Sequence, residues 1–148
     1  MTDKQSCEMP DSNPPADELR GLLTKAKTIA IVGLSDNPDR DSYRVGAYLR
    51  ERGYRIIPVN PSKTEILGER SYPDLASVPV PVDIVDIFRT VDAIPGIVEE
   101  AIKIRAGAVW MQLGLAHGES ARKAREAGLE VVQSRCIKIE HARLFTQG

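Results

Sequence analysis

Residues 33–44 combine side chains and main-chain features that suit the binding of phosphate groups. Gly33 ends an apolar run, residues 28–32, and a polar loop leads from it into a helical pattern. The loop and the start of that helix carry two serines, two arginines and a tyrosine: Ser35, Arg40, Ser42, Tyr43 and Arg44. Hydroxyl and guanidinium groups beside the free N–H groups of a helix start are what a multiply charged phosphate requires. The segment therefore predicts a site for the pyrophosphate of a nucleotide cofactor.

Single residues of this segment have simpler explanations. The full G-x-G-x-x-G pattern is absent, and a turn that merely ends a strand explains Gly33 about equally well. Arg40 or Arg44 taken alone is more often a solvated surface charge. The phosphate interpretation therefore depends on the combination of these groups.

The end of the next apolar run, residues 55–59, indicates the kind of nucleotide. NAD-binding domains usually carry a carboxylate here, which binds the ribose hydroxyls. This chain instead continues with Val59, Asn60, Pro61, Ser62 and Lys63. A lysine without a carboxylate favours a ribose that bears a phosphate, and so NADP or coenzyme A (CoA) over NAD. A plain turn is the alternative explanation of Asn60 and Pro61.

Alternating strands and helices must position these groups. Apolar runs predict five strands, at residues 28–33, 55–61, 82–88, 107–111 and 129–132. Helical spacing predicts helices at 16–25, 43–52, from about 94 to 102, at 119–127 and up to about 145. We expect an α/β fold: one Rossmann-like, doubly wound domain whose mostly parallel five-stranded sheet has helices on both faces. Its ligand should lie at the carboxyl ends of the strands, near the switch point.

One strand prediction contains a conflict. Pro58 lies within the second predicted strand and cannot donate a hydrogen bond to a neighbouring strand. We expect it at the end of the strand or turned away from its pairing side.

Composition narrows the class of protein. The 148 residues include 20 basic and 21 acidic side chains, for a net charge of −1, which gives no general attraction to nucleic acid or to an anionic membrane. The sequence shows neither a membrane-spanning run nor a secretory signal, so we expect a cytoplasmic protein. Residues 1–15 suggest a flexible tail, which leaves residues 16–148 as the domain. Cys7 and Cys136 predict neither a disulfide nor a metal cluster.

Few other residues suggest catalysis. His117 and His141 could act as general bases, but a surface or helix-end histidine is the commoner case. Asp83 and Asp86 are three apart on a strand, so they face opposite sides and cannot work as an acid–base pair. Cys136 could face the thiol of a cofactor or be oxidised with it, although such a cysteine is more often a small buried hydrophobe.

Several motifs, taken together and in order, resemble the stand-alone CoA-binding domain proteins, which are similar to the CoA-binding domain of the succinyl-CoA synthetase alpha subunit. The resemblance extends from about residue 27 to 144 and rests on residues 30–38, 53–54, 57–61, 66–68, 82–89, 109–114 and 136–141. It implies CoA across the carboxyl edge of a Rossmann-type sheet. It places Gly33 and Ser35, and also Ser42 and Arg44, at the phosphates. It also places Val59, Asn60, Pro61 and Lys63 around the nucleotide, and Phe88 and Arg89 along the pantetheine arm.

The resemblance also implies that the chain is not an enzyme, because the phosphorylated histidine of the synthetase comes from a second domain. We therefore expect a non-catalytic protein that binds CoA or acyl-CoA. An NADP-binding oxidoreductase or redox sensor is the alternative. Expected partners are the small-molecule ligand and either a second copy of the chain or a CoA ligase, with no nucleic acid and no membrane.

Overall fold

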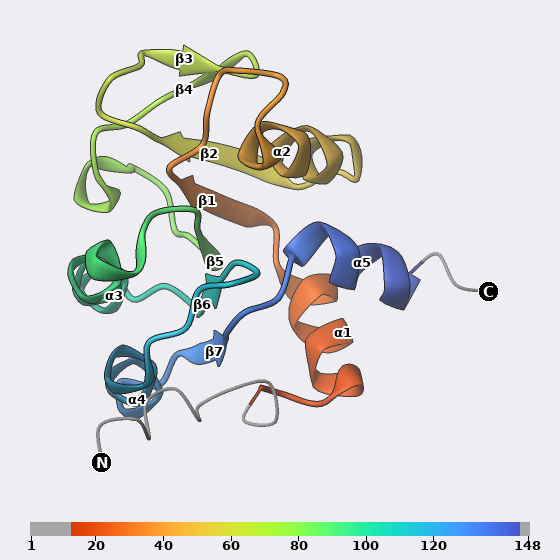
Figure 1. The fold of residues 1–148 in the computed structure, drawn as a ribbon, viewed down its shortest axis with the longest axis vertical. Helices are drawn as coiled ribbons and strands as arrows, with labels where there is room; N and C mark the ends of the chain where they lie inside the picture. Colours follow the sequence, from red (N-terminus) through yellow and green to blue (C-terminus); the bar gives the residue numbers. More distant parts are fainter. Residues whose placement is uncertain (1–12, 146–148) are drawn as a thin grey trace.

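Five parallel strands form the central sheet of the computed structural model, which describes residues 13–145. They are β1 (Thr28–Val32), β2 (Arg55–Val59), β5 (Ile84–Ile87), β6 (Ala108–Met111) and β7 (Glu130–Val132). Their spatial order is β2-β1-β5-β6-β7 (Figure 1). All four pairings are parallel. The five predicted strands are confirmed, although each is shorter than its predicted range, most of all β5, which was predicted at 82–88.

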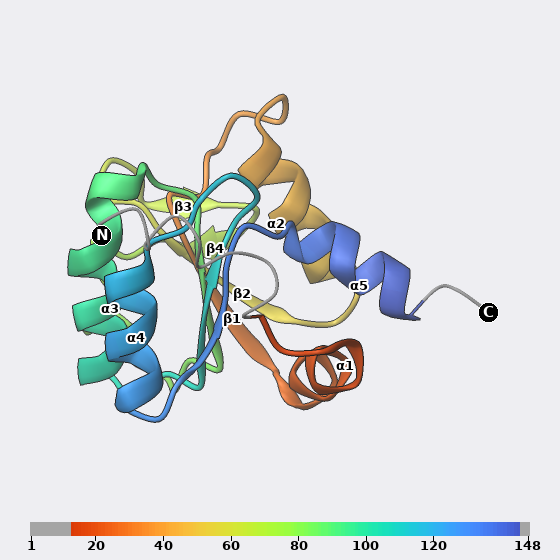
Figure 2. The ribbon, with the colours of Figure 1, turned by 60° about the horizontal axis from the view of Figure 1, so that its bottom comes forward.

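Helices cover both faces of this sheet. α1 (Ala16–Lys25), α2 (Asp41–Glu51) and α5 (Ile137–Phe145) lie on one face, and α3 (Ile94–Lys103) and α4 (Gly118–Glu126) lie on the other (Figure 2). A separate apolar core fills each side, one with Trp110 and Ile31 and the other with Val85 and Val109. Burial on both faces explains why the interiors of the strands are largely apolar and do not alternate, with Asp86 in β5 as an exception. The predicted Rossmann-like α/β architecture is therefore confirmed.

Pro58 lies in β2, which is an edge strand of the sheet. Its carbonyl accepts a hydrogen bond from the N–H of Tyr72 at 3.0 Å, on the side away from β1. On the inner side, the carbonyl of Val59 accepts from the N–H of Gly33 at 3.0 Å. The N–H and C=O of a strand residue point to the same side, so the proline nitrogen also faces outward. The proline is thus turned away from the paired side of the strand, as predicted.

The connection from β2 to β5 contains a small hairpin that the sequence patterns did not predict. β3 (Glu65–Ile66) and β4 (Glu69–Arg70) are antiparallel, and Leu67 and Gly68 turn between them with φ angles of 57° and 75°. Strands of two residues are too short to show a period. The predicted helical turn near residues 74–77 is present as η3 (Leu75–Ser77), and a second short turn, η4 (Val91–Ala93), precedes α3.

The start of the described chain contacts the far edge of the sheet. The side-chain amide of Asn13 donates to the carbonyl of Gln133 at 2.8 Å and accepts from its N–H at 2.7 Å. The predicted tail at residues 1–15 lies mostly outside the described residues. Within residues 13–145, no helix is both long and apolar enough to cross a membrane.

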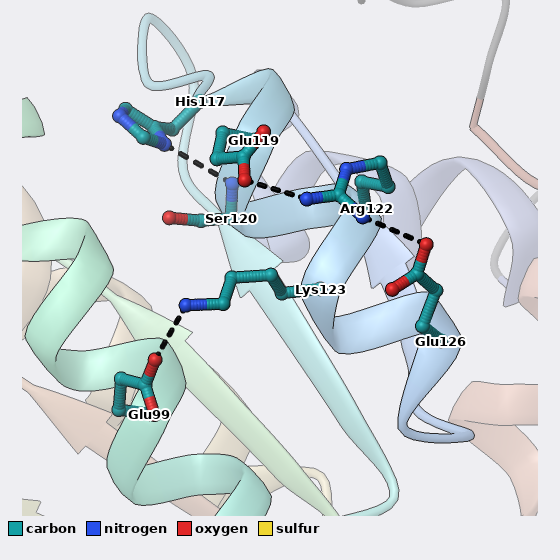
Figure 3. A network of polar contacts seen from close by, with 7 residues as sticks. All are labelled: Glu99, His117, Glu119, Ser120, Arg122, Lys123 and Glu126. Atoms are coloured by element: carbon teal, nitrogen blue, oxygen red, sulfur yellow. Dashed lines mark hydrogen bonds and ion pairs between the residues drawn. The ribbon is translucent and has the colours of Figure 1, made fainter.

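Charged side chains join the two helices of the α3 and α4 face. Lys123 Nζ lies 2.8 Å from Glu99 Oε2, which links α4 to α3 (Figure 3). Along α4, Arg122 bonds both Glu119 and Glu126 at 2.6 and 2.7 Å. These are exposed pairs, and each contributes little to stability.

Candidate functional site

A crevice opens at the carboxyl ends of β1 and β5, where the chain leaves the sheet in opposite directions. α2 follows β1 on one face, and α3 follows β5 on the other (Figure 2). Such a switch point is the usual ligand site of open α/β sheets. Three cavities meet at this crevice, and Phe88 lines all of them.

Two of the cavities overlap and form what we call the polar chamber, with volumes of about 480 and 360 Å³. It is bounded by the loops that follow β1, β2 and β5. Polar and charged side chains dominate its lining, among them Ser35, Asp36, Arg40, Asn60, Ser62, Lys63 and Arg89. This is the part of the crevice where the sequence predicted phosphate and nucleotide contacts.

Gly33 lines the polar chamber, and the close packing of the end of β1 against the end of β5 requires a glycine at this position. Its φ is +93°, and a Cβ atom there would lie 2.7 Å from the carbonyl oxygen of Phe88 and 2.9 Å from Arg89 Cδ. No larger residue fits without displacing backbone. The contact with the end of β5 therefore explains this glycine without any ligand, in line with the simpler explanation of a strand-ending turn.

The loop after β1 uses some of the N–H groups that the phosphate hypothesis expected to be free. Ser35 N donates to Ser42 Oγ at 2.9 Å, and Asn37 N donates to Ser35 Oγ at 3.0 Å. Both serine hydroxyls therefore shape the loop. Their remaining hydrogen-bonding capacity is available to a ligand.

The first turn of α2 keeps its donors free. The cap residue is Arg40, whose side chain makes no capping bond. Within residues 13–145, the N–H groups of Asp41, Ser42 and Tyr43 have no hydrogen-bond acceptor. A helix start with unpaired N–H groups beside the guanidinium group of Arg40 is suited to an anion.

Asn60 joins the loops after β1 and β2. Its Nδ2 donates to the carbonyl of Leu34 at 3.0 Å, and its Oδ1 accepts from Ser62 N at 2.9 Å. The side chain thus forms a turn and a bridge between loops, which supports the plain-turn explanation for this residue. Next to it, Lys63 Nζ lies 3.0 Å from Asp36 Oδ2.

The third cavity, which we call the apolar chamber, has a volume of about 590 Å³. The loop after β6 and the start of α5 form much of it. Its lining combines apolar side chains with a few polar ones: Asp41, Arg44, Val45, Phe88, Arg89, Gln112, Leu113, Leu115, Cys136, Lys138 and Ile139. Leu113 and Ile139 are 66% and 55% exposed, which is unusual for large apolar side chains and leaves apolar surface at this cavity.

Every predicted site residue except Tyr43 lines one of these chambers. Arg44 lines the apolar chamber, although the resemblance placed it at the phosphates. The prediction missed Lys138 and Ile139 on α5. No local signal identifies them, because they reach the site only through the packing of the last helix.

The two histidines lie elsewhere. His117 caps α4, and its Nδ1 accepts from Ser120 N at 3.2 Å, so it is the helix-end residue that was predicted (Figure 3). For His141 the prediction of a surface or helix-end position is wrong. His141 lies in the middle of α5, and its side chain is buried. Its Nδ1 is 3.0 Å from the hydroxyl of Tyr48, and its ring stacks on Phe145. Burial and the positive charge of Arg52 lower the pKa of His141.

Asp86 is fully buried in β5, beside Ile31 and Trp110 on the neighbouring strands. Neither of its carboxylate oxygens has a hydrogen-bond partner in the described part of the chain. Burial therefore raises the pKa of Asp86 well above the ordinary carboxyl value. Asp83 lies outside the strand, where its carboxylate accepts from the N–H groups of Lys27 and Thr28 at 2.8 and 2.9 Å.

Comparison with known proteins shows where this architecture recurs. The family model for the CoA binding domain matches residues 27–142. The protein YneT of Bacillus subtilis is 41% identical over 130 residues, which cover 88% of this chain and 96% of YneT. A solved structure of a hypothetical protein from Pyrococcus horikoshii is 40% identical, with a TM-score of 0.88 over 92% of this chain and 96% of that one.

A larger protein also contains a related segment. The ADP-forming acetate–CoA ligase II of Archaeoglobus fulgidus is 29% identical over 126 residues, which cover 82% of this chain. The match spans only 19% of the ligase, so the remainder of that enzyme has no counterpart in this alignment.

Proposed function

The chain belongs to the CoA-binding domain family, and from this premise we propose that it binds CoA or an acyl-CoA in the crevice between β1 and β5 without catalysing a reaction. The nucleotide end occupies the polar chamber. The pantetheine arm passes Phe88 and enters the apolar chamber.

One observation carries this proposal: the polar chamber and the apolar chamber adjoin each other and share lining residues. Phe88 lines all three cavities, and Arg89 lines both the polar and the apolar chamber. A ligand that fills both must have a highly charged end and a long, less polar arm. CoA has this shape, with phosphates at one end and a pantetheine thiol at the other.

The donors of the polar chamber fit a diphosphate and a further phosphate. The unpaired N–H groups at the start of α2 and the guanidinium group of Arg40 are placed for the diphosphate. Lys63, at the carboxylate-free end of β2, is placed for a phosphate on the ribose. The same lysine would suit NADP, which the experiment below therefore includes.

Titration calorimetry with CoA, acetyl-CoA and NADPH tests the proposal. We expect saturable binding of CoA or acetyl-CoA and no displacement of CoA by NADPH. Lys63→Gln should weaken CoA binding, whereas the control Lys27→Gln, at the opposite edge of the sheet, should not. No saturable binding up to millimolar CoA would contradict the proposal, and tighter binding of NADPH would favour the oxidoreductase alternative.

The relationship to a segment of a CoA ligase supports a second proposal, about partners. Leu113 and Ile139 leave apolar surface at the apolar chamber, where a ligase subunit or a second copy of the chain would meet the end of the ligand. Co-purification from the native host would recover such a ligase. Recovery of a clean monomer would count against both partners.

A further inference from the structure

A further cavity lies at the amino ends of β1 and β2, at the end of these strands opposite to the crevice. Its volume is about 490 Å³, which is within the range of small-molecule sites. The C-terminal ends of α1 and α2 and the last residue of α5 complete its walls. Its lining combines apolar surface with three cations: Leu23, Tyr54 and Phe145, and Lys27, Arg52 and Arg55.

The protein leaves these cations largely without counter-charges. Within residues 13–145, the side chains of Lys27 and Arg55 form no ion pair or hydrogen bond, and no acidic residue lines the cavity. Arg52 lies 3.8 Å from Glu51, its neighbour in the chain, whose side chain is 77% exposed. Asp83 lies close by, but its Oδ2 accepts from two main-chain N–H groups. The chain as a whole has 20 basic and 21 acidic residues, so this excess of positive charge is local.

The ends of helices explain only part of this charge. Arg52 is the C-cap of α2, where the partial negative charge of the last carbonyl groups favours a cation. Lys27 and Arg55 lie instead at the starts of two adjacent strands. Arg55 N donates to the carbonyl of Lys27 at 2.8 Å, so two residues of like charge are neighbours, and both line the same cavity. An anion in the cavity would offset their mutual repulsion.

Tertiary contacts hold the apolar walls of the cavity in place. The Tyr54 hydroxyl donates to the carbonyl of Leu23 at 2.5 Å, which joins the start of β2 to α1. Phe145 stacks on the ring of His141 with the ring centroids 4.6 Å apart, yet it remains 38% exposed. The cavity therefore presents an aromatic ring on a packed support beside three cations.

We propose that this cavity binds a small phosphate monoester that carries a ring, such as an aryl phosphate or a nucleoside monophosphate. The phosphate group carries about two negative charges near neutral pH and is bound by Lys27, Arg52 and Arg55. The ring of the ligand packs on Phe145 and Tyr54. The cavity and the crevice lie at opposite ends of the strands, so this proposal does not depend on the binding of CoA.

His141 provides a probe of this site. Burial, and then the positive charge of Arg52, lower the pKa of His141. A phosphate bound to Arg52 offsets that charge and should therefore raise the pKa of His141. Other ionisable groups contact the same aromatic cluster: Arg20, Tyr48, Tyr54 and Lys138. They are present with and without the ligand, so a change on its addition reports the new anion.

NMR titration of the His117→Asn protein with phenyl phosphate tests the proposal, because His141 is then the remaining histidine. Asparagine can still cap α4. At low ionic strength we expect a saturable shift of the His141 ring signals and a higher pKa of His141. Inorganic phosphate should bind more weakly, and phenol should cause no shift at the same concentration. No saturable shift with phenyl phosphate, or equal affinity for either of the other two probes, would overturn the proposal.

Two further variants in this background locate the site. Arg55→Gln should raise the dissociation constant of phenyl phosphate about five-fold, as expected for the loss of one exposed ion pair. Lys25→Gln is the matched control, because it removes one positive charge from the last turn of α1 but does not line the cavity. It should leave the constant nearly unchanged. Equal losses in both variants would indicate attraction by net charge alone, and an unchanged constant for Arg55→Gln would place the probe elsewhere. Either result overturns the proposal.

Discussion

Lys63 Nζ lies 3.0 Å from Asp36 Oδ2, and this ion pair joins the loop after β2 to the loop after β1 beside the polar chamber. Both side chains are about half exposed, so water screens the pair and a phosphate can compete for the lysine. Asp36 also places a negative charge where the proposed ligand carries its own. We therefore expect the pair to oppose binding of the proposed ligand to a modest extent.

Asp36→Asn should tighten CoA binding, because it frees Lys63 and removes a repulsive charge. Exposed pairs contribute up to about 1 kcal/mol, which corresponds to roughly five-fold in the dissociation constant. Calorimetry with CoA and with 3′-dephospho-CoA measures the effect. The gain should be larger for CoA if Lys63 binds the ribose phosphate. Weaker binding by the variant would show that Asp36 itself contacts the ligand.

Arg44→Ala should weaken CoA binding and leave the melting temperature of the free protein nearly unchanged. Among residues 13–145, the guanidinium group bonds only Asp41 Oδ1 at 3.0 Å and the carbonyl of Asp39 at 2.7 Å, both at exposed residues. Arg50→Ala is a matched control on the same helix, with a similar exposed pair to Glu69 at 3.1 Å but no part in either chamber. A large loss of stability for Arg44→Ala alone would identify Arg44 as a structural residue.

Gly33→Ala should destabilise the protein in the absence of any ligand. The left-handed φ and the 2.7 Å approach to the carbonyl oxygen of Phe88 predict a cost of roughly 1–3 kcal/mol in the free energy of unfolding. Urea denaturation measures it. Gly21→Ala, inside α1 with nothing within 4 Å of the added carbon, should be neutral or slightly stabilising. Unchanged stability of Gly33→Ala would show that the end of β5 adjusts freely.

Asp86→Asn should raise the free energy of unfolding at neutral and alkaline pH by roughly 1–3 kcal/mol, because a buried carboxylate without partners is costly to ionise. Burial raises the pKa of Asp86 in the folded state, so the folded protein holds this proton more tightly than the unfolded chain. The wild-type protein therefore loses stability as the pH rises from the ordinary value of 3.8 through the raised pKa.

Thermal unfolding at a series of pH values tests whether the stability of the wild-type protein falls as the pH rises. The difference between Asp86→Asn and the wild-type protein should be small in acid and should widen as the pH rises. Because both proteins contain His141, the titration of that residue cancels in the difference. A constant difference across the series would show that Asp86 is not the titrating group.

Much of the polar chamber could be predicted because its residues follow directly after strands. Parallel strands bring their carboxyl ends to one edge, so Ser35, Lys63 and Arg89 had to lie near one another once the strands were assigned. The reason for Gly33 could not be predicted in the same way. Its close neighbour is the carbonyl of Phe88, far along the chain, and a single glycine does not reveal which backbone approaches it.

The sequence by itself determined the α/β class, the parallel sheet and the edge at which a ligand belongs, because apolar periodicity and strand-end residues are local properties of the chain. Only the tertiary structure decided that the packing of α5 brings Ile139, and Cys136 just before the helix, to the apolar chamber. It also decided that His141 is buried beside Tyr48 and that Lys63 meets Asp36. These contacts join segments distant in sequence. Their geometry depends on how whole helices pack on the sheet, and no local pattern encodes that packing.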